Sequence, residues 1–235
     1  MLQGAQNLSL YNGIVNRSRL AMTFPLLKIL GHEIAISDWT PNSKRVVWAA
    51  SCVAFFGSFR MRELLASKEN CIDSETLTWD CVNFTSESTA VIQVRFPKNS
   101  KNGSCQFVDI FKVDKPAVCP YECLKNLKTS SSWSFKKDSP VFRFESGKLL
   151  TTGHFTKIIR NLLRPHLGNL VQQLSGHSFR AGIPAALANH PSLLSSDDVQ
   201  KWGRWTSSSY LAYTKLKLAA RKEIFKKLLY AIEKK

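Results

Sequence analysis

Two residues of a helix-like stretch, His177 and Arg180, have the types and the spacing needed to hold a phosphate. Residues three apart on a helix project from the same face, so both side chains can reach one small anion. Arg presents a planar fork of donors that suits a phosphate, and His holds or passes a proton near neutral pH. Downstream, Trp205 adds an indole, and Tyr210 and Tyr213 add phenols close in sequence to this pair. The set indicates phosphoryl transfer with tyrosine as a covalent nucleophile, although His-x-x-Arg alone is common by chance.

The order of these residues resembles the catalytic core of the tyrosine recombinases. The matching segments are Gly-His-Ser-Phe-Arg at 176–180, Gly-Arg-Trp at 203–205 and Tyr-Leu-Ala-Tyr-Thr-Lys at 210–215. The similarity is greatest to the eukaryotic mobile-element branch, with its DIRS-type retrotransposons and Crypton-type transposons. The resemblance implies DNA strand cleavage and rejoining through a covalent 3′-phosphotyrosyl intermediate, as in site-specific recombination or integration of a mobile element. It implies no metal, nucleotide or other cofactor.

A second segment, Arg-Met-Arg-Glu-Leu at 60–64, resembles the first motif of the same family, in which Arg is followed three residues later by Glu. The resemblance implies that Arg60 binds the scissile phosphate together with Arg180, and that Glu63 orients the basic groups. From the residues alone, an Arg60–Glu63 ion pair at a helix end, without any ligand, explains the segment as well. Arg62 stands where the family usually has a small residue, and is expected to face solvent or the DNA backbone.

The resemblance also implies a lysine on a β-hairpin, acting as the general acid. Ser-Lys-Asn-Gly at 100–103 resembles the family's Ser-Lys-Thr-Gly, so Lys101 is the first candidate and Lys98 the second. For both, a turn lysine that only contacts solvent is the competing interpretation. Tyr213 is the expected nucleophile because Tyr-Thr-Lys resembles the family's Tyr-Ile-Arg, and Tyr210 is the alternative.

The remaining roles follow from the same resemblance. His177 is expected to assist proton transfer or to hold the phosphate. Trp205 takes the place where many relatives have His, and its indole N–H can donate to a phosphate oxygen. Two other functions stay open: a DNA-binding protein of this fold that no longer recombines, and a type IB topoisomerase with the same chemistry.

The charge of the chain points to a polyanionic partner. Lys and Arg number 33 against 17 Asp and Glu, a formal net charge of +16. Residues 200–235 alone hold ten basic and two acidic side chains, a net of +8. Double-stranded DNA is the expected partner, and a charged helix face that only contacts solvent is the alternative. The same segment has a stripe of apolar residues among its lysines. From the residues alone, this stripe is expected to pack on the core of its own chain; the resemblance implies instead that it docks on a neighbouring protomer on DNA. The stripe comprises Ile224, Phe225, Leu228, Leu229 and Ile232.

Periodicity predicts the elements that would position these residues. We expect helices over 23–31, 44–67, 120–127 and 153–167, and one that carries His177 and Arg180. Alternating apolar residues predict strands over 77–84, 90–96 and 105–111, with a hairpin turn at 97–104. The expected fold class is mainly α with a small three-stranded antiparallel β-sheet (α+β), which is the tyrosine recombinase catalytic-domain fold that the resemblance implies.

The chain is expected to have a loose N-terminal segment, residues 1–20, and a catalytic domain over residues 21–235. The separate N-terminal core-binding domain of the family is expected to be absent. No apolar run approaches the length of about 18 residues that spans a bilayer, so no membrane partner is expected. The six cysteines lack zinc-finger spacing and are interpreted as thiols of an intracellular protein. With a eukaryotic type of DNA substrate, the expected location is the nucleus.

Overall fold

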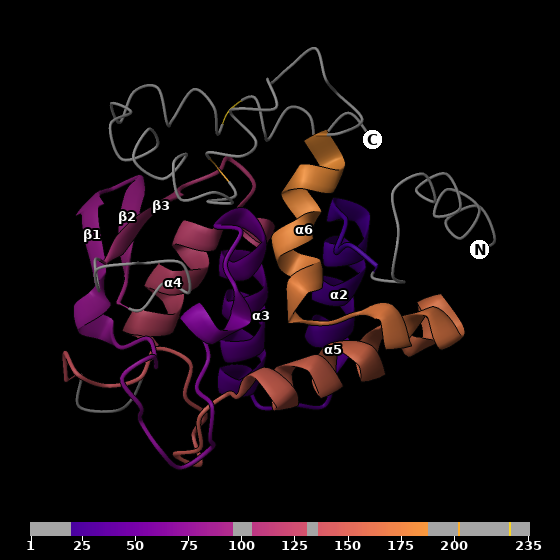
Figure 1. Cartoon of the computed structure of the whole chain (residues 1–235), viewed down its shortest axis with the longest axis horizontal. Coiled ribbons are helices and arrows are strands. Elements are labelled where there is room, and N and C mark those ends of the chain that lie inside the picture. Colours follow the sequence, from indigo (N-terminus) through magenta and orange to yellow (C-terminus); the bar gives the residue numbers. More distant parts are fainter. Residues whose placement is uncertain (1–19, 96–104, 131–135, 188–201, 203–225, 227–235) are drawn as a thin grey trace.

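A computed structural model describes residues 20–95, 105–130, 136–187, 202 and 226, which are mainly helical with one small sheet (Figure 1). The helices are α2 (Phe24–Ile36), α3 (Pro41–Phe56), α4 (Pro120–Thr129), α5 (Thr152–Leu167) and α6 (Gly176–Leu187). The strands are β1 (Val82–Ser86), β2 (Thr89–Val94) and β3 (Gln106–Phe111). Short 3₁₀ turns are η2 (Met61–Glu63), η3 (Trp79–Cys81), η4 (Pro116–Val118) and η5 (Gly168–Gln173). The α+β class expected from the sequence is confirmed.

The sheet is an antiparallel meander in the order β1-β2-β3. Ala90 of β2 pairs with Phe84 of β1 and with Ile110 of β3, and both Ala90 and Ile110 are buried. The three strands are those predicted by alternation. The first begins later than expected, because Trp79–Cys81 form the turn η3 instead of extended backbone.

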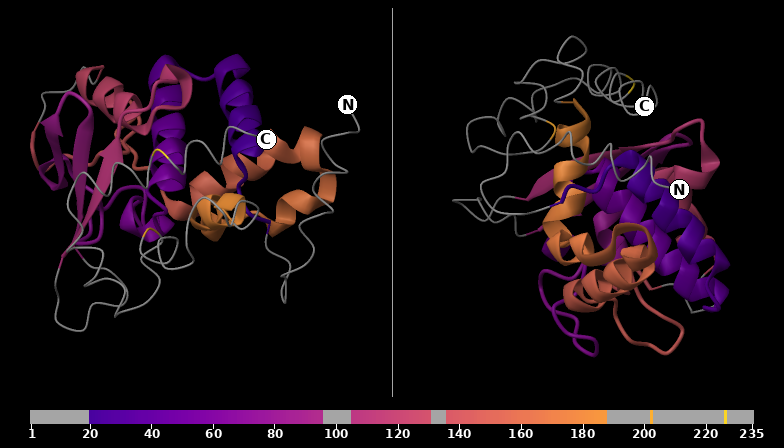
Figure 2. Two further views of the ribbon diagram at one scale, coloured as in Figure 1. Left: turned by 90° about the horizontal axis from the view of Figure 1, so that it is seen from above. Right: turned by 90° about the vertical axis from the view of Figure 1, so that its right-hand side faces the viewer.

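Helix α3 is the centre of the fold. Its residues from Val46 to Phe56 are apolar on nearly every side, and all but Trp48 are buried. A helix of this composition is stable only when neighbours cover it on several sides. In the view from above, α3 lies between the sheet with α4 on one side and α2 with α5 on the other, while α6 packs along it (Figure 2). The predicted buried central helix is therefore confirmed.

The predicted ends of α2 and α3 were wrong. Helix α2 does not stop at Gly31 but continues to Ile36, because this glycine makes room for a ring: a Cβ there would lie 2.8 Å from the indole of Trp48. Helix α3 begins three residues earlier than expected, at Pro41 and not Lys44, since Thr40 and not Asn42 or Ser43 is its N-cap. It also ends at Phe56 instead of Ser67, at the turn described below.

Helix α4 begins where the sequence predicts, and α5 begins at Thr152, one residue before the predicted Gly153. The cap of α5 is Thr151, whose Oγ1 accepts from the backbone N–H of His154 at 3.1 Å. The cap of α4 is Cys119, whose Sγ accepts from the N–H of Glu122 at 3.4 Å. Helix α4 ends two residues beyond the predicted Leu127.

The six cysteines are all free thiols in the structure. In the part of the chain that the structure describes, no helix is long and apolar enough to cross a bilayer.

Candidate active site

The site begins at the turn that ends α3. Phe59 N–H donates to the carbonyl of Ala54 at 3.1 Å, and Ser58 N–H donates to that of Phe55 at 3.3 Å. This is the hydrogen-bond pattern of a Schellman C-cap, in which the residue after the cap takes a left-handed conformation. Ser58 occupies that position with φ 47° and is fully buried. Glycine is the usual residue there, so a serine in this conformation carries backbone strain.

The glycine of this turn is Gly57, one position before Ser58, because a side chain at Gly57 would collide with Phe59. A Cβ on Gly57 would lie 2.2 Å from the ring of Phe59, which folds back over the end of α3. This packing fixes the course of the chain immediately before Arg60.

Arg60 is held by Glu63. The carboxylate accepts from the backbone N–H of Arg60 through Oε2 and from its Nη1 through Oε1, both at 2.9 Å. The Glu63 side chain is 4% exposed and that of Arg60 is 20% exposed. One end of the guanidinium is thus oriented by a buried carboxylate, while part of the Arg60 side chain stays accessible. The predicted Arg60–Glu63 ion pair is present. Because this pair is expected whether or not Arg60 binds a phosphate, it does not distinguish between the two interpretations.

Helix α6 brings the second arginine to the same turn. Arg180 Nη1 donates to the carbonyl of Ser58 at 2.9 Å, across 122 positions of sequence. Arg180 is only 3% exposed, whereas His177, one turn earlier on α6, is exposed. The two candidates therefore share a helix, as predicted, but differ in their access to solvent.

The side chains of Ser175 and Ser178 accept backbone hydrogen bonds at the start of α6. Ser175 N–H donates to Ser178 Oγ at 2.9 Å, and the N–H of His177 donates to Ser175 Oγ at 3.3 Å. Such side-chain bonds replace the helix partners that first-turn N–H groups lack. They place His177 in the first turn, where backbone N–H groups favour a nearby anion.

Two glycines let α6 approach α3 and η2 closely. A Cβ on Gly176 would lie 2.6 Å from Met61 Cγ, and one on Gly182 would lie 2.3 Å from the carbonyl oxygen of Met22 and 2.5 Å from Phe55 Cε2. Met22 N–H also donates to the carbonyl of Ser178 at 2.8 Å. This close contact is what brings Arg180 to the turn at the end of α3.

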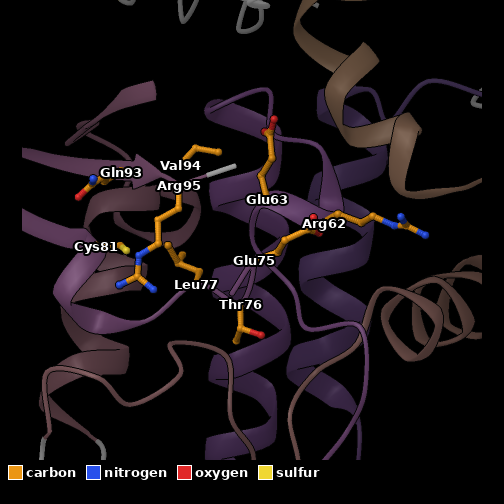
Figure 3. A pocket seen from close by; sticks show the side chains of 9 residues that line it. All are labelled: Arg62, Glu63, Glu75, Thr76, Leu77, Cys81, Gln93, Val94 and Arg95. Atoms are coloured by element: carbon orange, nitrogen blue, oxygen red, sulfur yellow. The ribbon is translucent and has the colours of Figure 1, made fainter. Parts of the chain in front are cut away.

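The hairpin predicted to carry the lysine starts beside Glu63. Arg62 and Glu63 line one small pocket together with Gln93 and Arg95, which lie at the end of β2 (Figure 3). Arg95 forms an ion pair with Asp80, and its guanidinium points away from that of Arg62 in Figure 3. Arg95, the last described residue before position 96, is thus anchored next to the Arg60–Glu63 turn.

The structure therefore brings together Arg60, Glu63 and Arg180, with His177 on the same helix as Arg180. Lys101 and Lys98, Trp205, and both Tyr213 and Tyr210 lie outside the described residues. Sequence reasoning missed the carbonyl of Ser58 and the Asp80–Arg95 pair. A backbone acceptor has no residue-type signal, and a pair 15 positions apart in a strand-and-turn region has no periodic one.

The arrangement of these elements matches solved structures of tyrosine recombinases, which places the described chain in that class of fold. The site-specific recombinase XerH bound to its difH substrate, in a pre-cleavage complex, aligns with a TM-score of 0.54 at 14% identity. That alignment covers 90% of this chain and 55% of XerH. A Holliday-junction complex of the Flpe W330F mutant aligns with a TM-score of 0.51 at 8% identity, over 94% of this chain and 50% of Flpe.

The chain thus spans about half the length of these recombinases. No protein-family profile and no curated protein sequence matches it. At such low identities the likeness concerns the fold.

Proposed function

We propose that this chain is a catalytic domain that cleaves and rejoins DNA strands through a covalent 3′-phosphotyrosyl intermediate. The observation that supports this most is the convergence of Arg60 and Arg180 on one turn. Arg60 belongs to this turn and Arg180 donates to the carbonyl of Ser58 in it. Guanidinium groups that reach the same phosphodiester are suited to its non-bridging oxygens. The fold shared with XerH, which its structure shows on a DNA substrate, and the net charge of +16 agree with double-stranded DNA as the partner.

In the proposed reaction, Tyr213 Oη attacks the phosphorus atom and the bond to the 5′-oxygen breaks. Lys101 gives that oxygen its proton, while Arg60 and Arg180 neutralise the charge that builds on the phosphoryl oxygens. His177 accepts the proton that Tyr213 Oη loses, and the indole N–H of Trp205 donates to a phosphoryl oxygen. The products are a 3′-phosphotyrosyl bond and a free 5′-hydroxyl, and attack by a 5′-hydroxyl on the phosphotyrosine reverses the step.

A second candidate function is DNA binding without cleavage, in a remnant of such a recombinase that has been adopted by a host. The low exposure of Arg180 favours this alternative, because a phosphate must gain access to a guanidinium that is 3% exposed in the free chain. The two candidates differ in whether a covalent adduct forms.

A nicked-substrate trapping assay tests the proposal. The chain is incubated in EDTA with nicked duplexes drawn from a randomised pool, so that the 5′-hydroxyl fragment diffuses away, and is then run on a denaturing gel. We expect a protein–DNA band that is absent with Tyr213→Phe and retained with Tyr210→Phe. With Arg60→Ala we expect its rate of formation to fall by about a hundredfold or more, as for other losses of a transition-state donor.

Arg164→Ala is the matched control, since Arg164 is an exposed arginine on α5. It is expected to leave the rate unchanged. Tight duplex binding with no band from any pool would establish the non-cleaving alternative. Loss of the band only in Tyr210→Phe would move the nucleophile to that residue.

We place the chain in the eukaryotic mobile-element branch because of its motifs at 176–180 and 203–215, and we place its action in the nucleus for that reason. Self-association on DNA through the apolar stripe at 224–232 is expected, and sedimentation with and without duplex checks it.

A further inference from the structure

A second surface of the molecule lies at the other end of α2 and α3. There, α2, α3 and the η4 turn border an open groove with a volume of about 460 Å³. Its floor is apolar and includes Ile34 and Ala35 of α2 and the half-buried Trp48 of α3. Trp48 is fixed, because its Nε1 donates to the carbonyl of Ala117 at 2.9 Å and its ring fits against Gly31.

The rim of the groove is basic. Lys28 and His32 of α2 and Lys44 and Arg45 of α3 line it, and none of its described lining residues is acidic. Lys44 Nζ donates to the carbonyl of Ala35 at 2.8 Å, which holds one ammonium group at the edge of the floor. The groove thus combines an apolar floor with a cationic border.

This groove is distinct from the candidate active site. Lys44 and Trp48 lie in the first half of α3, whereas the Ser58 turn follows its last residue. With a rise of about 1.5 Å per residue, about 14–20 Å of helix separate the two. A clamp on the scissile phosphate therefore does not explain the basic rim.

We propose that this groove docks an acidic segment of a partner protein, which lays apolar side chains on Trp48 and Ala35 and pairs its carboxylates with the rim. Charge complementarity selects this occupant. Residues 1–19 contain two arginines and no acidic residue, and residues 200–235 have a net charge of +8, so neither of these segments, in this chain or in a second copy, complements the rim. The DNA backbone complements the charge but offers nothing apolar for the floor.

The size and the surroundings of the groove fit a short peptide anchor. A volume of this order accepts a few side chains and not a whole helix. Ile36, which follows Ala35 in α2, is 64% exposed and extends the apolar surface at the end of that helix. An amphipathic acidic segment would thus insert its apolar residues into the groove and leave its carboxylates at the border.

The probe for the test is a fluorescein-labelled peptide with Leu and Trp four residues apart among Glu and Asp. Two peptides are compared with it, one with Ser in place of Leu and Trp and one with Lys in place of the acids. The protein variants are Lys28→Glu/Arg45→Glu, which reverses charge on the rim, and Ala35→Tyr, which fills the floor at an exposed position. Lys68→Glu/Lys157→Glu, at two exposed lysines away from the groove, changes the net charge equally.

We expect fluorescence anisotropy to show that the acidic apolar peptide binds the parent chain and the control variant alike. Both groove variants should weaken it at least about tenfold, which is about 1.4 kcal/mol. Equal binding of the Ser-containing peptide, or equal loss in the control, would overturn the proposal by showing attraction of charge alone. Loss of duplex binding in the groove variants would also overturn the proposal, because it would assign the groove to DNA. Dissociation of a dimer in these variants would overturn it by assigning the groove to a second copy of the chain. Since the readout is peptide binding, absence of DNA cleavage does not bear on it.

Discussion

At the scale of single residues, the carboxylate of Glu63 is the group on which the geometry of Arg60 depends. It is nearly removed from water and accepts two hydrogen bonds from the same residue, one from the backbone and one from the guanidinium. A buried carboxylate is tolerated only when donors replace its water shell, and bonds between charged partners are the strongest of these. The pair therefore contributes to stability and also selects the rotamer of Arg60.

Replacing Glu63 by Gln is expected to lower the free energy of unfolding by about 1–3 kcal/mol. Gln keeps the size of the side chain, but it removes the charge and leaves a buried group with only one acceptor oxygen for two donors. Urea denaturation measures the difference. The matched control is Glu87→Gln, because the Glu87 side chain is 96% exposed and pairs with Lys125 at 3.4 Å. Equal losses in the two variants would contradict the role given to burial.

Much of the described site could be predicted at this scale. Residue type and spacing singled out Arg180, while Arg60 and Glu63 were predicted as site residues through the resemblance to the recombinase motif. Arginines in an apolar stretch also indicated a need for partners or ligands. The acceptor on Ser58 could not be predicted, because every residue has a carbonyl and only the left-handed turn aims this one at α6. The different exposures of His177 and Arg180 also depend on what covers α6, which helical spacing does not reveal.

At the scale of elements, the contact between α6 and α3 sets where Arg180 lies. Gly182 faces Phe55 and the carbonyl of Met22 without space for a methyl group. Gly153, in the first turn of α5, has no atom within 4 Å of the position that a Cβ would take. Gly182 and Gly153 are the same type of residue, but only Gly182 has neighbours that leave no space for a methyl group.

Gly182→Ala is expected to destabilise the protein by about 1–3 kcal/mol, as overpacking in a filled core does. Gly153→Ala is expected to leave stability unchanged or to raise it by up to about 1 kcal/mol, because Ala restricts the unfolded chain more than Gly. Thermal unfolding of both variants measures this. A stabilised Gly182→Ala would show that α6 is not in close contact with α3.

Periodicity predicted which elements exist better than where they end. The apolar run of α3 and the alternation of β2 and β3 are properties of the residues themselves, so the sequence predicts them. Gly31 was misinterpreted as a helix stop because its reason is the ring of Trp48, which is 17 positions away. The end of α3 was also missed, since Ser58 takes the left-handed position at which a glycine is the expected signal.

At the scale of the whole molecule, the described elements share one core around α3, and buried thiols lie within it. Cys52 of α3 is completely buried, and Cys119 and Cys123 of α4 are its neighbours. Burial raises the pKa of the Cys52 thiol well above its usual range, and the adjacent thiols of Cys123 and Cys119 raise it further. This thiol is thus protonated in the folded chain at pH values where it ionises in the unfolded chain.

The stability of the whole molecule is therefore expected to fall as the pH rises above about 8.5, where an unfolded thiol starts to lose its proton. The folded state then holds the proton of Cys52 and the unfolded state does not, so the free energy of unfolding decreases by up to about 1.4 kcal/mol per pH unit from this group. Urea denaturation across this pH range measures how steeply the free energy of unfolding falls with pH.

Cys52→Ala removes the contribution of this thiol, so the free energy of unfolding of this variant should fall less steeply with pH. The packing lost in the variant lowers its stability at every pH and does not change this comparison. Cys71→Ala, at an exposed thiol, should keep the parent slope. Parallel slopes for Cys52→Ala and the parent would mean that Cys52 ionises alike in both states, and that α3 is not closed off from water by α4.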